Sequence, residues 1–583
     1  MKHIARYIRP YSWFITLTVF IKFIATLVEL FLPKLMATII DEVVPAEKEA
    51  IANGGSSADG IRTILIYAVG MIACAFVALA GNMVANGMAS KSSADITRNV
   101  RRDLFMKTTA LSAKQVDKFT VSSLISRLTS DSYHINEVLA MTQRMGIRAP
   151  ILLIGGLIMT MTLDPVLTLV LAATLPLIVF TIGFVTWKSI PIYKSEQDTL
   201  DEMVRVVQEN AGGVRVIKAL SKSDYEKERF CKVSAELSRK ERRAGKLMST
   251  TNPITSLILN LGFCVVLVVG AYRVADGKTE PGSILAFLTY FTIILNAMMS
   301  VTRIFVRWSR GLASAQRISD VLTAREDMPI LSLPACDEDA HIVFDGVSFS
   351  YNGVETNLDD LSFSLGRGET LGIIGATGSG KSTLISLLVR FYDPDRGAIR
   401  IGGRDVRSIP TDELRRKFGV VFQNDFIVGT NIRENVDFYR DLPDDKLSSA
   451  AKDAQAAEFI EAAENTWERD VTSRGTNLSG GQKQRLLVAR ALAADPEILI
   501  LDDSSSALDY KTDMQMRRAI REHHGKTTTV IVAQRVSAIR HANLILVLDD
   551  GVVVGRGTHE TLMRDSEIYR SIAEVQMGGE MDG

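Results

Sequence analysis

The sequence predicts a membrane domain of six helices followed by an α/β domain built around a parallel sheet. Long apolar runs recur before residue 310 and then stop, which is typical of membrane-spanning helices. From His341 onward, short apolar strands alternate with helices, which is the pattern of an α/β domain. At 583 residues, the chain is also too long for a single hydrophobic core. Together these observations predict an all-α membrane domain joined to an α/β domain.

Six apolar segments are expected to span the membrane, and most are long enough to cross ~30 Å of hydrocarbon. The third and fourth spans meet at Asp164-Pro165, so they must form a tight hairpin. The first span is too long for the core of a signal peptide and lacks a small-residue cleavage site after it, so we expect it to be retained. The spans are placed near Trp13–Val43, Ile64–Asn86, Ile147–Leu163, Pro165–Trp187, Ile254–Val274 and Ser283–Val306.

The distribution of basic residues predicts the orientation of the spans. Lys and Arg concentrate in the stretches 89–146 and 188–247, whereas the stretch 41–63 is mainly acidic. We therefore expect both termini in the cytoplasm, in an integral protein of the bacterial plasma membrane whose surroundings include the lipid bilayer. The formal net charge of zero gives no reason to expect a nucleic-acid partner.

Both long cytoplasmic stretches mix apolar and charged residues at helical spacing, so the spans should continue as helices beyond the bilayer. Residues 89–112, if helical, extend roughly 35 Å. The turns of these extensions, near residues 116–124 and 214–225, should reach the domain that follows the membrane domain.

Lys22 and Glu29 lie inside the first span, seven residues apart on one helix face. A charge at the centre of a bilayer costs ~2.5–3.5 kcal/mol on insertion scales, so both should face protein or water. Interhelical packing or snorkelling is the favoured interpretation, and a place on the substrate path is the alternative.

The domain boundaries follow from these changes of pattern. We expect the membrane domain over 1–318, a linker over 319–340, the α/β domain over 341–576 and a short tail over 577–583. The linker prediction depends on the proline-containing and acidic segment before His341.

A glycine-rich loop connects the apolar strand Leu371–Ile374 to the helix expected over Lys381–Phe391. Strand, loop and helix in this order match the P-loop, whose backbone N–H groups bind the phosphates of ATP or GTP. Lys381 should reach the β- and γ-phosphates, and Ser382 should hold Mg²⁺. The loop consists of Gly375, Ala376, Thr377, Gly378, Ser379, Gly380, Lys381, Ser382 and Thr383.

Two further motifs complete the nucleotide chemistry. The buried strand that begins at Ile498 ends on Asp502 and Asp503, and Asp502 takes the role of the Walker B acid at the metal. Before the helix LLVARALAA, a second phosphate-binding helix start is formed by Leu478, Ser479, Gly480, Gly481 and Gln482. Because one chain has one P-loop and one such motif, two chains are expected head to tail, with ATP between them.

On these motifs the chain resembles, over essentially its whole length, an ATP-binding cassette (ABC) half-transporter of the exporter type. The resemblance implies the type IV-like exporter fold, with ATP and Mg²⁺ as cofactors. Tyr351 matches the aromatic residue that stacks on adenine, and Gln423 matches the Q-loop glutamine at the Mg²⁺. Ser506 and Asp509 match the D-loop, and the turns near 116–124 and 214–225 match the coupling helices.

The chain departs from the family pattern at three positions. Asp503 replaces the glutamate that polarises the attacking water, so its carboxylate should stop ~1.5 Å short, and an error of ~1 Å can cost ~100-fold in rate. Gln534 replaces the switch histidine and cannot carry a positive charge. The third departure is in Asp470–Gly475, where the family usually has a glutamate near Ser473, so the local coupling contact made by that glutamate is not expected in the same form.

These departures favour a subunit that binds ATP well and hydrolyses it poorly. With its signature motif intact, the chain is expected to complete the catalytic site of a second ABC half-transporter, where most hydrolysis by this ATPase and translocase would occur. A homodimer with two slow sites is the alternative, as an exporter or a lipid flippase. A nucleotide-gated regulatory subunit is less favoured. The substrate, whether amphipathic drug, lipid or peptide, is not determined by the sequence, and direction rests on the resemblance alone.

Overall fold

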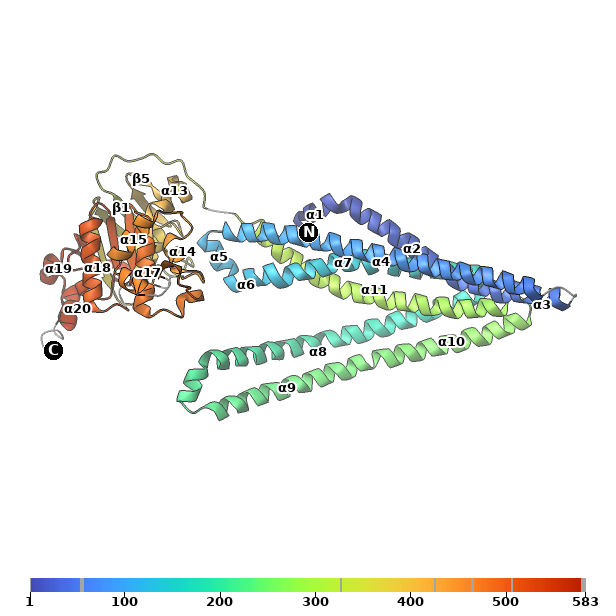
Figure 1. The fold of residues 1–583 in the computed structure, drawn as a ribbon. Coiled ribbons are helices and arrows are strands. Elements are labelled where there is room, and N and C mark those ends of the chain that lie inside the picture. The colour runs from blue at the N-terminus through green and yellow to red at the C-terminus, as the bar shows by residue number, and fades with distance from the viewer. Residues whose placement is uncertain are drawn as a thin grey trace. The chain divides into compact units, whose positions relative to one another are not determined.

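The computed structural model describes residues 2–52, 57–325, 328–423, 426–462, 466–504 and 507–577. The chain folds into two compact units (Figure 1). One unit contains the residues up to Thr109 together with Ser122–Thr323, and the other contains Ala110–Val121 together with the residues from Ala324 onward.

The first unit is built from long helices, and six of the helical segments are apolar and long enough to cross a membrane, as predicted. At ~1.5 Å per residue, the 53 residues of α4 and the 55 residues of α8 each extend roughly 80 Å, far more than one bilayer. The expected continuation of the spans beyond the membrane is therefore present. The helices are α1 (Lys2–Ile8), α2 (Ser12–Thr38), α3 (Val44–Ala52), α4 (Ser57–Thr109), α6 (Val121–Ser126), α7 (Ser132–Leu163), α8 (Pro165–Ala219), α9 (Ser223–Ser249), α10 (Thr251–Ala275) and α11 (Pro281–Leu322).

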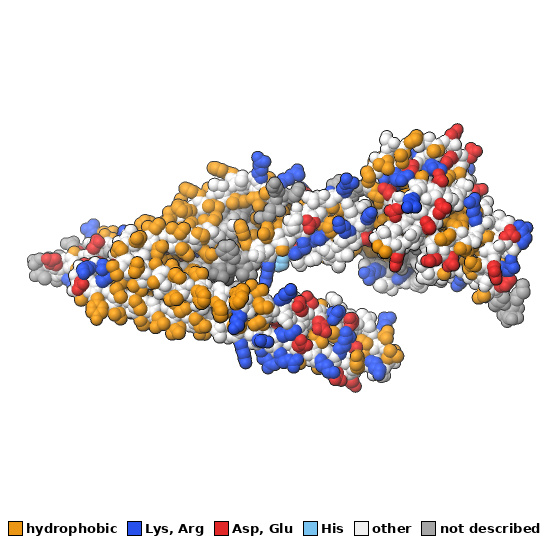
Figure 2. Space-filling view, turned by 180° about the vertical axis from the view of Figure 1, so that it is seen from behind, with side chains coloured by type: hydrophobic (Ala, Val, Ile, Leu, Met, Phe, Trp, Pro, Cys, Tyr) orange, Lys and Arg blue, Asp and Glu red, His pale blue; other side chains and the backbone are white. Residues whose placement is uncertain are grey.

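The surface side chains of these helices change from hydrophobic to charged along the length of the helices. Figure 2 shows hydrophobic side chains covering one stretch of the long helices, while charged side chains cover the α8–α9 end. Large apolar side chains such as Phe76, Leu169 and Phe180 are mostly exposed in the hydrophobic stretch. Because water penalises such exposure and hydrocarbon does not, this stretch is the part that lies in the bilayer.

Lys22 and Glu29 each contact a different neighbouring helix. Lys22 is 3% exposed, and its ammonium donates to Asn86 Oδ1 on α4 at 3.0 Å. Glu29 pairs with Arg148 on α7 at 2.6 Å. Both charges thus have protein partners, which is what interhelical packing requires.

The hairpin between α7 and α8 is held by the carboxylate of Asp164. Asp164 accepts hydrogen bonds from the backbone N–H groups of Val166 and Leu167 at 2.8 and 3.2 Å, and so caps α8. Arg273 also donates to Asp164, at 2.5 Å. The short turn predicted at Asp164-Pro165 is therefore capped at the start of α8 and held to α10.

The two turns that the sequence places on the cytoplasmic side fall within or beside the predicted segments. After α4 ends at Thr109, the chain forms α5 (Ala113–Phe119), and Thr120 turns it with a φ of 61° into α6. The second turn lies at residues 220–222, between α8 and α9. Of these segments, residues 110–121 belong to the second unit.

The second unit contains two sheets. A four-stranded antiparallel sheet has the order β2-β1-β4-β5, and a six-stranded sheet has the order β10-β9-β3-β8-β7-β6. In the larger sheet all neighbours pair in parallel except β10 and β9. The strands are β1 (Ile342–Phe349), β2 (Leu358–Leu365), β3 (Thr370–Gly375), β4 (Arg396–Ile401), β5 (Arg404–Asp405), β6 (Phe418–Val421), β7 (Ile498–Asp502), β8 (Thr528–Val532), β9 (Leu544–Asp549) and β10 (Val552–Gly557).

Helices cover the larger sheet on both faces, so its central strands are buried and mainly apolar. In β7 every residue is buried: Leu499 and Leu501 point into one hydrophobic core, and Ile498 and Ile500 point into the other. The predicted α/β class is therefore confirmed. The helices are α12 (Lys381–Leu388), α13 (Thr411–Arg416), α14 (Ile432–Asp437), α15 (Asp444–Asp453), α16 (Ala457–Glu461), α17 (Gly480–Ala493), α18 (Tyr510–His523), α19 (His559–Asp565) and α20 (Glu567–Met577).

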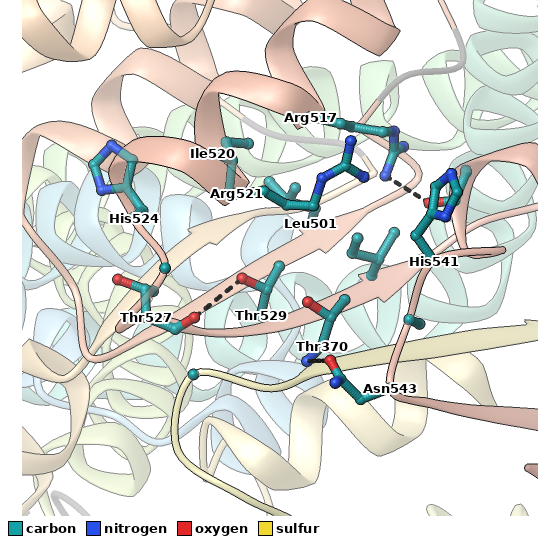
Figure 3. Close-up of a pocket in the computed structure, with 15 residues that line it drawn as sticks. Thr370, Leu501, Arg517, Ile520, Arg521, His524, Thr527, Thr529, His541 and Asn543 are labelled. Atoms are coloured by element: carbon teal, nitrogen blue, oxygen red, sulfur yellow. Dashed lines mark hydrogen bonds between the residues drawn. The ribbon is translucent and has the colours of Figure 1, made fainter. Parts of the chain in front are cut away.

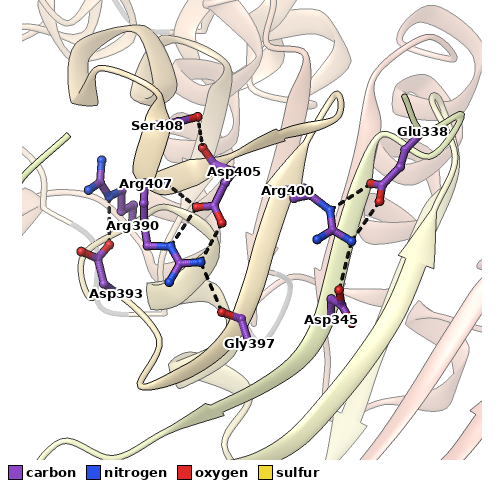
Figure 4. Close-up of polar contacts among 9 residues, drawn as sticks. All are labelled: Glu338, Asp345, Arg390, Asp393, Gly397, Arg400, Asp405, Arg407 and Ser408. Carbon is purple, nitrogen blue, oxygen red and sulfur yellow. Dashed lines mark hydrogen bonds and ion pairs between the residues drawn. The ribbon is translucent and has the colours of Figure 1, made fainter. Parts of the chain in front are cut away.

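Arginines hold the segment before β1 against this unit (Figure 4). Arg400 on β4 pairs with Glu338 at 2.9 Å and with Asp345 at 3.2 Å. The buried Arg390 pairs with Asp393 and donates to the carbonyl of Pro329 at 2.8 Å. The residues just before β1 thus run along the α/β unit rather than free of it.

Candidate nucleotide site

The glycine-rich loop has the backbone that a P-loop needs. β3 ends at Gly375, and Gly378 and Gly380 adopt φ values of 90° and 97°, which other residues rarely adopt. A Cβ on Gly380 would lie 2.9 Å from the carbonyl oxygen of Asn357, and one on Gly375 would lie 2.1 Å from that of Leu548. Only glycine fits at these two places, so the loop can turn tightly into α12.

The start of α12 presents donors for an anion. Gly380 is its N-cap and supplies no side-chain acceptor, so the first backbone N–H groups lack a side-chain cap. Lys381 Nζ donates to the carbonyls of Gly375 and Ala376 at 3.0 and 2.6 Å, which places the ammonium inside the loop. Burial lowers the Lys381 pKa more than Asp502 and Asp503 raise it. The negative charge of a bound triphosphate would stabilise this partly buried ammonium.

The remaining loop residues fall into a solvent-exposed group and a buried group. Ala376, Thr377, Gly378 and Ser382 are exposed, whereas Ser379 and Thr383 are buried. The Ser382 hydroxyl therefore lies on the open side of the helix start, where the sequence predicts a Mg²⁺ ligand. The helix ends at Leu388, earlier than the predicted Phe391, because Arg390 adopts a left-handed φ of 53°.

Asp502 and Gln423 lie close to the loop. Asp502 is 5% exposed, and its carboxylate accepts from the backbone N–H of Gln423. Burial and the neighbouring Asp503 raise the Asp502 pKa, while Lys381 lowers it. The described residues contain no cluster of three His, Cys, Asp or Glu side chains that could hold a metal alone. This donor set fits Mg²⁺, which is usually bound by one or two carboxylates together with phosphates and water.

The two altered positions contact each other. Gln534 Nε2 donates to Asp503 Oδ2 at 3.2 Å, so the amide at the switch-histidine position is hydrogen-bonded to the shortened acid. Asp503 has a φ of 49°, and its N–H donates to the carbonyl of Val532 on β8 at 3.0 Å. Burial raises the Asp503 pKa, and Arg535 opposes this shift. The Asp503 carboxylate and the Gln534 amide are therefore hydrogen-bonded partners of each other.

Tyr351 stands edge-on in an aromatic cluster. Its ring centroid is 4.9 Å from that of Phe349 and 5.0 Å from that of Tyr392, both in T-shaped geometry. Tyr351 is half exposed, which suits an adenine-stacking residue. The sequence prediction did not include Tyr392, whose hydroxyl donates to Asp117 on α5. Its signal was the aromatic pair Phe391-Tyr392 immediately after the P-loop helix.

The signature motif forms a capped helix start, as its sequence predicts. Ser479 is the N-cap of α17: its hydroxyl accepts from the N–H of Gln482 at 3.3 Å, and Gln482 Oε1 accepts from the N–H of Ser479 at 3.0 Å. Leu478 is buried beneath it. A Cβ on Gly480 would lie 3.2 Å from Ala507, so the motif packs closely against the D-loop of its own chain.

The D-loop is attached to the signature helix. The N–H of Ala507 donates to Gln484 Oε1 at 3.0 Å, a contact that the sequence interpretation missed. Asp509 caps α18 by accepting from the N–H of Thr512 at 2.9 Å. Ser506 lies outside the described residues. Ser473 begins a short helical turn next to Gly429.

Comparison with known proteins agrees with this geometry. A family described as "ABC transporter transmembrane region" matches residues 15–298, and one described as "ABC transporter" matches residues 358–506. The chain is 33% identical over 582 residues to the ABC transporter ATP-binding protein YfiB of Bacillus subtilis (strain 168), covering 100% of this chain and 99% of YfiB. It is 30% identical to the ABC transporter ATP-binding protein Rv1273c of Mycobacterium tuberculosis (strain ATCC 25618 / H37Rv), covering 98% of this chain and 97% of that protein.

A solved structure shares the fold. The ATP-bound structure of a bacterial Atm1-family ABC exporter superposes with a TM-score of 0.79 at 23% identity. The match covers 97% of this chain and 98% of that one.

Proposed function

Because the chain belongs to the ABC transporter family, with its transmembrane region and ATP-binding domain in one polypeptide, we propose that it is the degenerate-site subunit of a heterodimeric exporter. ATP-driven transport is the function of the family. The proposal adds that this chain's own P-loop site binds ATP and hydrolyses it poorly, while its signature motif completes the active site of its partner.

The contact between Asp503 and Gln534 carries the proposal. An acid one methylene shorter than glutamate and an amide without positive charge stand together at the γ-phosphate end of the site, 3.2 Å apart. Neither change affects the glycines, Lys381 or Asp502, which serve binding. A site of this composition retains affinity and loses the groups that position the attacking water.

The signature motif supports the second half of the proposal. The capping box pairs the N–H groups of Ser479 and Gln482 and so fixes the start of α17. The donors left for a nucleotide held by another chain are the Ser479 hydroxyl and the N–H groups of Gly480 and Gly481. If both sites of a dimer were degenerate, this motif would serve only slow sites. An intact motif beside an altered Walker B region is better explained by a partner with a complete P-loop site.

The residues fit the cofactors that this role needs. Lys381 and the N–H groups at the start of α12 bind the phosphates, and Tyr351 offers a ring face to the base. Ser382, Gln423 and Asp502 would hold Mg²⁺, which neutralises phosphate charge when it is bound. Tyr392 then links the base-binding tyrosine to Asp117 on α5, the segment that corresponds to the first coupling helix.

Export of an amphipathic small molecule, lipid or peptide is proposed on the likeness to the exporter structure and on the apolar spans. A homodimeric exporter or lipid flippase is the second candidate, and it requires that the chain alone hydrolyse ATP at a useful rate. A nucleotide-gated regulator is the third, and it requires ATP binding without flux.

Measurements on the purified protein separate these functions. The chain alone should hydrolyse ATP slowly, and co-expression with a half-transporter that has glutamate after its Walker B acid should raise the rate at least tenfold. ATP-dependent flux in vesicles with both subunits would exclude the regulator. Vigorous turnover by the chain alone would overturn the heterodimer proposal.

A further inference from the structure

The second unit contains a cavity of about 270 Å³ that is separate from the P-loop (Figure 3). It lies between α18 and the face of the larger sheet formed by Thr370, Thr529 and Ile531. The loop before β9 closes another side through His541 and Asn543. None of the P-loop or signature residues lines it, so the cavity is not part of the proposed ATP site.

The lining combines an apolar floor with basic side chains. Leu501, Ile520 and Ile531 are buried at its floor. Four basic side chains line the cavity, and none of the described lining residues is Asp or Glu. The basic residues are Arg517, Arg521, His524 and His541.

Two of these basic residues are already paired with carboxylates outside the cavity. Arg517 Nε donates to both carboxylate oxygens of Asp513 at 2.9 and 3.0 Å. Its guanidinium also donates to the carbonyl of Ala538 at 3.0 Å, as drawn in Figure 3. His524 Nε2 lies 3.0 Å from Asp453 Oδ2.

Arg521 and His541 differ from this pair. In the described part of the chain, neither side chain makes an ion pair or a hydrogen bond. Arg521 follows Arg517 by four residues on α18, so two guanidinium groups share one helix face beside the same cavity. Burial lowers the His541 pKa, and the charges of Arg521 and Arg540 lower it further. An anion in the cavity would relieve the repulsion between the positive charges of Arg521 and a protonated His541.

We propose that this cavity binds a small amphipathic anion, with its charged group at Arg521 and its apolar part on Leu501, Ile520 and Ile531. The volume lies just below the ~300 Å³ at which drug-sized pockets begin, so the occupant is about the size of an aromatic acid. Leu501 directly precedes Asp502, so the occupant contacts the strand that carries the metal-site acid. The site goes beyond the proposed transport function and does not depend on it.

Benzoate, benzamide and benzamidine test the proposal because they share one shape and carry negative, zero and positive charge. Binding is measured by ligand-detected NMR on the full-length protein with saturating ATP and Mg²⁺, which fills the P-loop. Benzoate should bind at least tenfold more tightly than benzamide, and benzamidine should bind most weakly. Equal affinity for benzoate and benzamide would overturn the proposal.

Matched variants locate the effect. Arg521→Gln should reduce benzoate affinity to that of benzamide, and Arg521→Lys should keep the preference. Arg518→Gln is the control, because Arg518 lies on the same helix, pairs with Glu522 at 2.7 Å and does not line the cavity. If Arg518→Gln weakened benzoate as much as Arg521→Gln does, the anion would be bound by general surface charge and the assignment would be wrong.

Discussion

On the proposed function, the P-loop region and the Asp503–Gln534 region belong to one nucleotide site but differ in which of the family's residues they retain. The P-loop has its required glycines, its lysine and a nearby Asp502 with little solvent exposure. In the second region, a shortened acid and a neutral amide are hydrogen-bonded to each other. If the proposal holds, ATP binding and ATP hydrolysis depend on separate groups of residues in this chain, so that binding can be kept while hydrolysis weakens.

Removal of the P-loop lysine should have the largest effect, and that effect should be on ATP affinity. Charge-assisted hydrogen bonds contribute about 2–3 kcal/mol, so Lys381→Ala should lower the ATP affinity of the chain on the order of 100-fold. Titration with a fluorescent ATP analogue measures this. Lys417→Ala, at a lysine that pairs with Glu497 away from the loop, is the control and should leave affinity unchanged.

Restoring the family's usual residues at positions 503 and 534 should have the next largest effect. Asp503→Glu with Gln534→His should raise single-turnover hydrolysis at this chain's own site roughly 10- to 100-fold, because the acid regains its reach and the switch position its charge. ATP affinity should change little. Asp549→Glu, at an exposed strand end, is the matched control. No gain in rate would show that the two substitutions are not what limits hydrolysis.

Tyr392→Phe should have a smaller effect, on the link between the nucleotide and α5. The ring packing against Tyr351 is kept, but the hydroxyl loses its hydrogen bond to Asp117. ATP affinity should stay within about twofold, and the stimulation of ATPase activity by co-expressed partner should fall about threefold, as a single hydrogen bond of about 1 kcal/mol allows. An equal loss of affinity would mean that Tyr392 acts on the base site alone.

The smallest predicted effect concerns the pH dependence of stability. His341 is buried with its Nδ1 2.7 Å from Thr528 Oγ1, and burial lowers its pKa below the ordinary 6.5, with Arg367 and Lys417 lowering it further and Glu497 opposing. The unfolded chain therefore takes up a proton below pH 6.5 that the folded chain does not. Stability should be full above pH 6.5 and fall as the pH drops through the folded pKa.

Thermal unfolding at pH 7.5 and 5.5 measures this dependence. The melting temperature of the α/β unit should drop by about 2 °C more for the wild type than for His341→Gln. An identical pH dependence in the two proteins would assign the change to other groups.

The sequence predicted those features whose residues lie close together along the chain, and it missed those whose residues lie far apart. The strand, loop and helix of the P-loop and the cap at Ser479 depend on neighbours a few residues away, and the sequence predicted both. The Asp503–Gln534 bond joins residues 31 apart, and the Tyr392–Asp117 bond joins residues 275 apart. Such contacts depend on how strands and loops are placed in space, which spacing in the sequence does not encode. The same holds for the cavity, whose lining comes from several separate segments.

The most direct test of the degenerate-site account compares Lys381→Ala with Ser479→Arg, each made in this chain and assayed in complex with its partner. On this account, Lys381 serves the slow site of this chain, whereas Ser479 serves the fast site of the partner. The account predicts that Lys381→Ala keeps at least about half of the ATPase activity and that Ser479→Arg lowers it at least tenfold, with the exposed Ser537→Arg as control. An equal loss in both variants would show two equivalent sites and contradict the account.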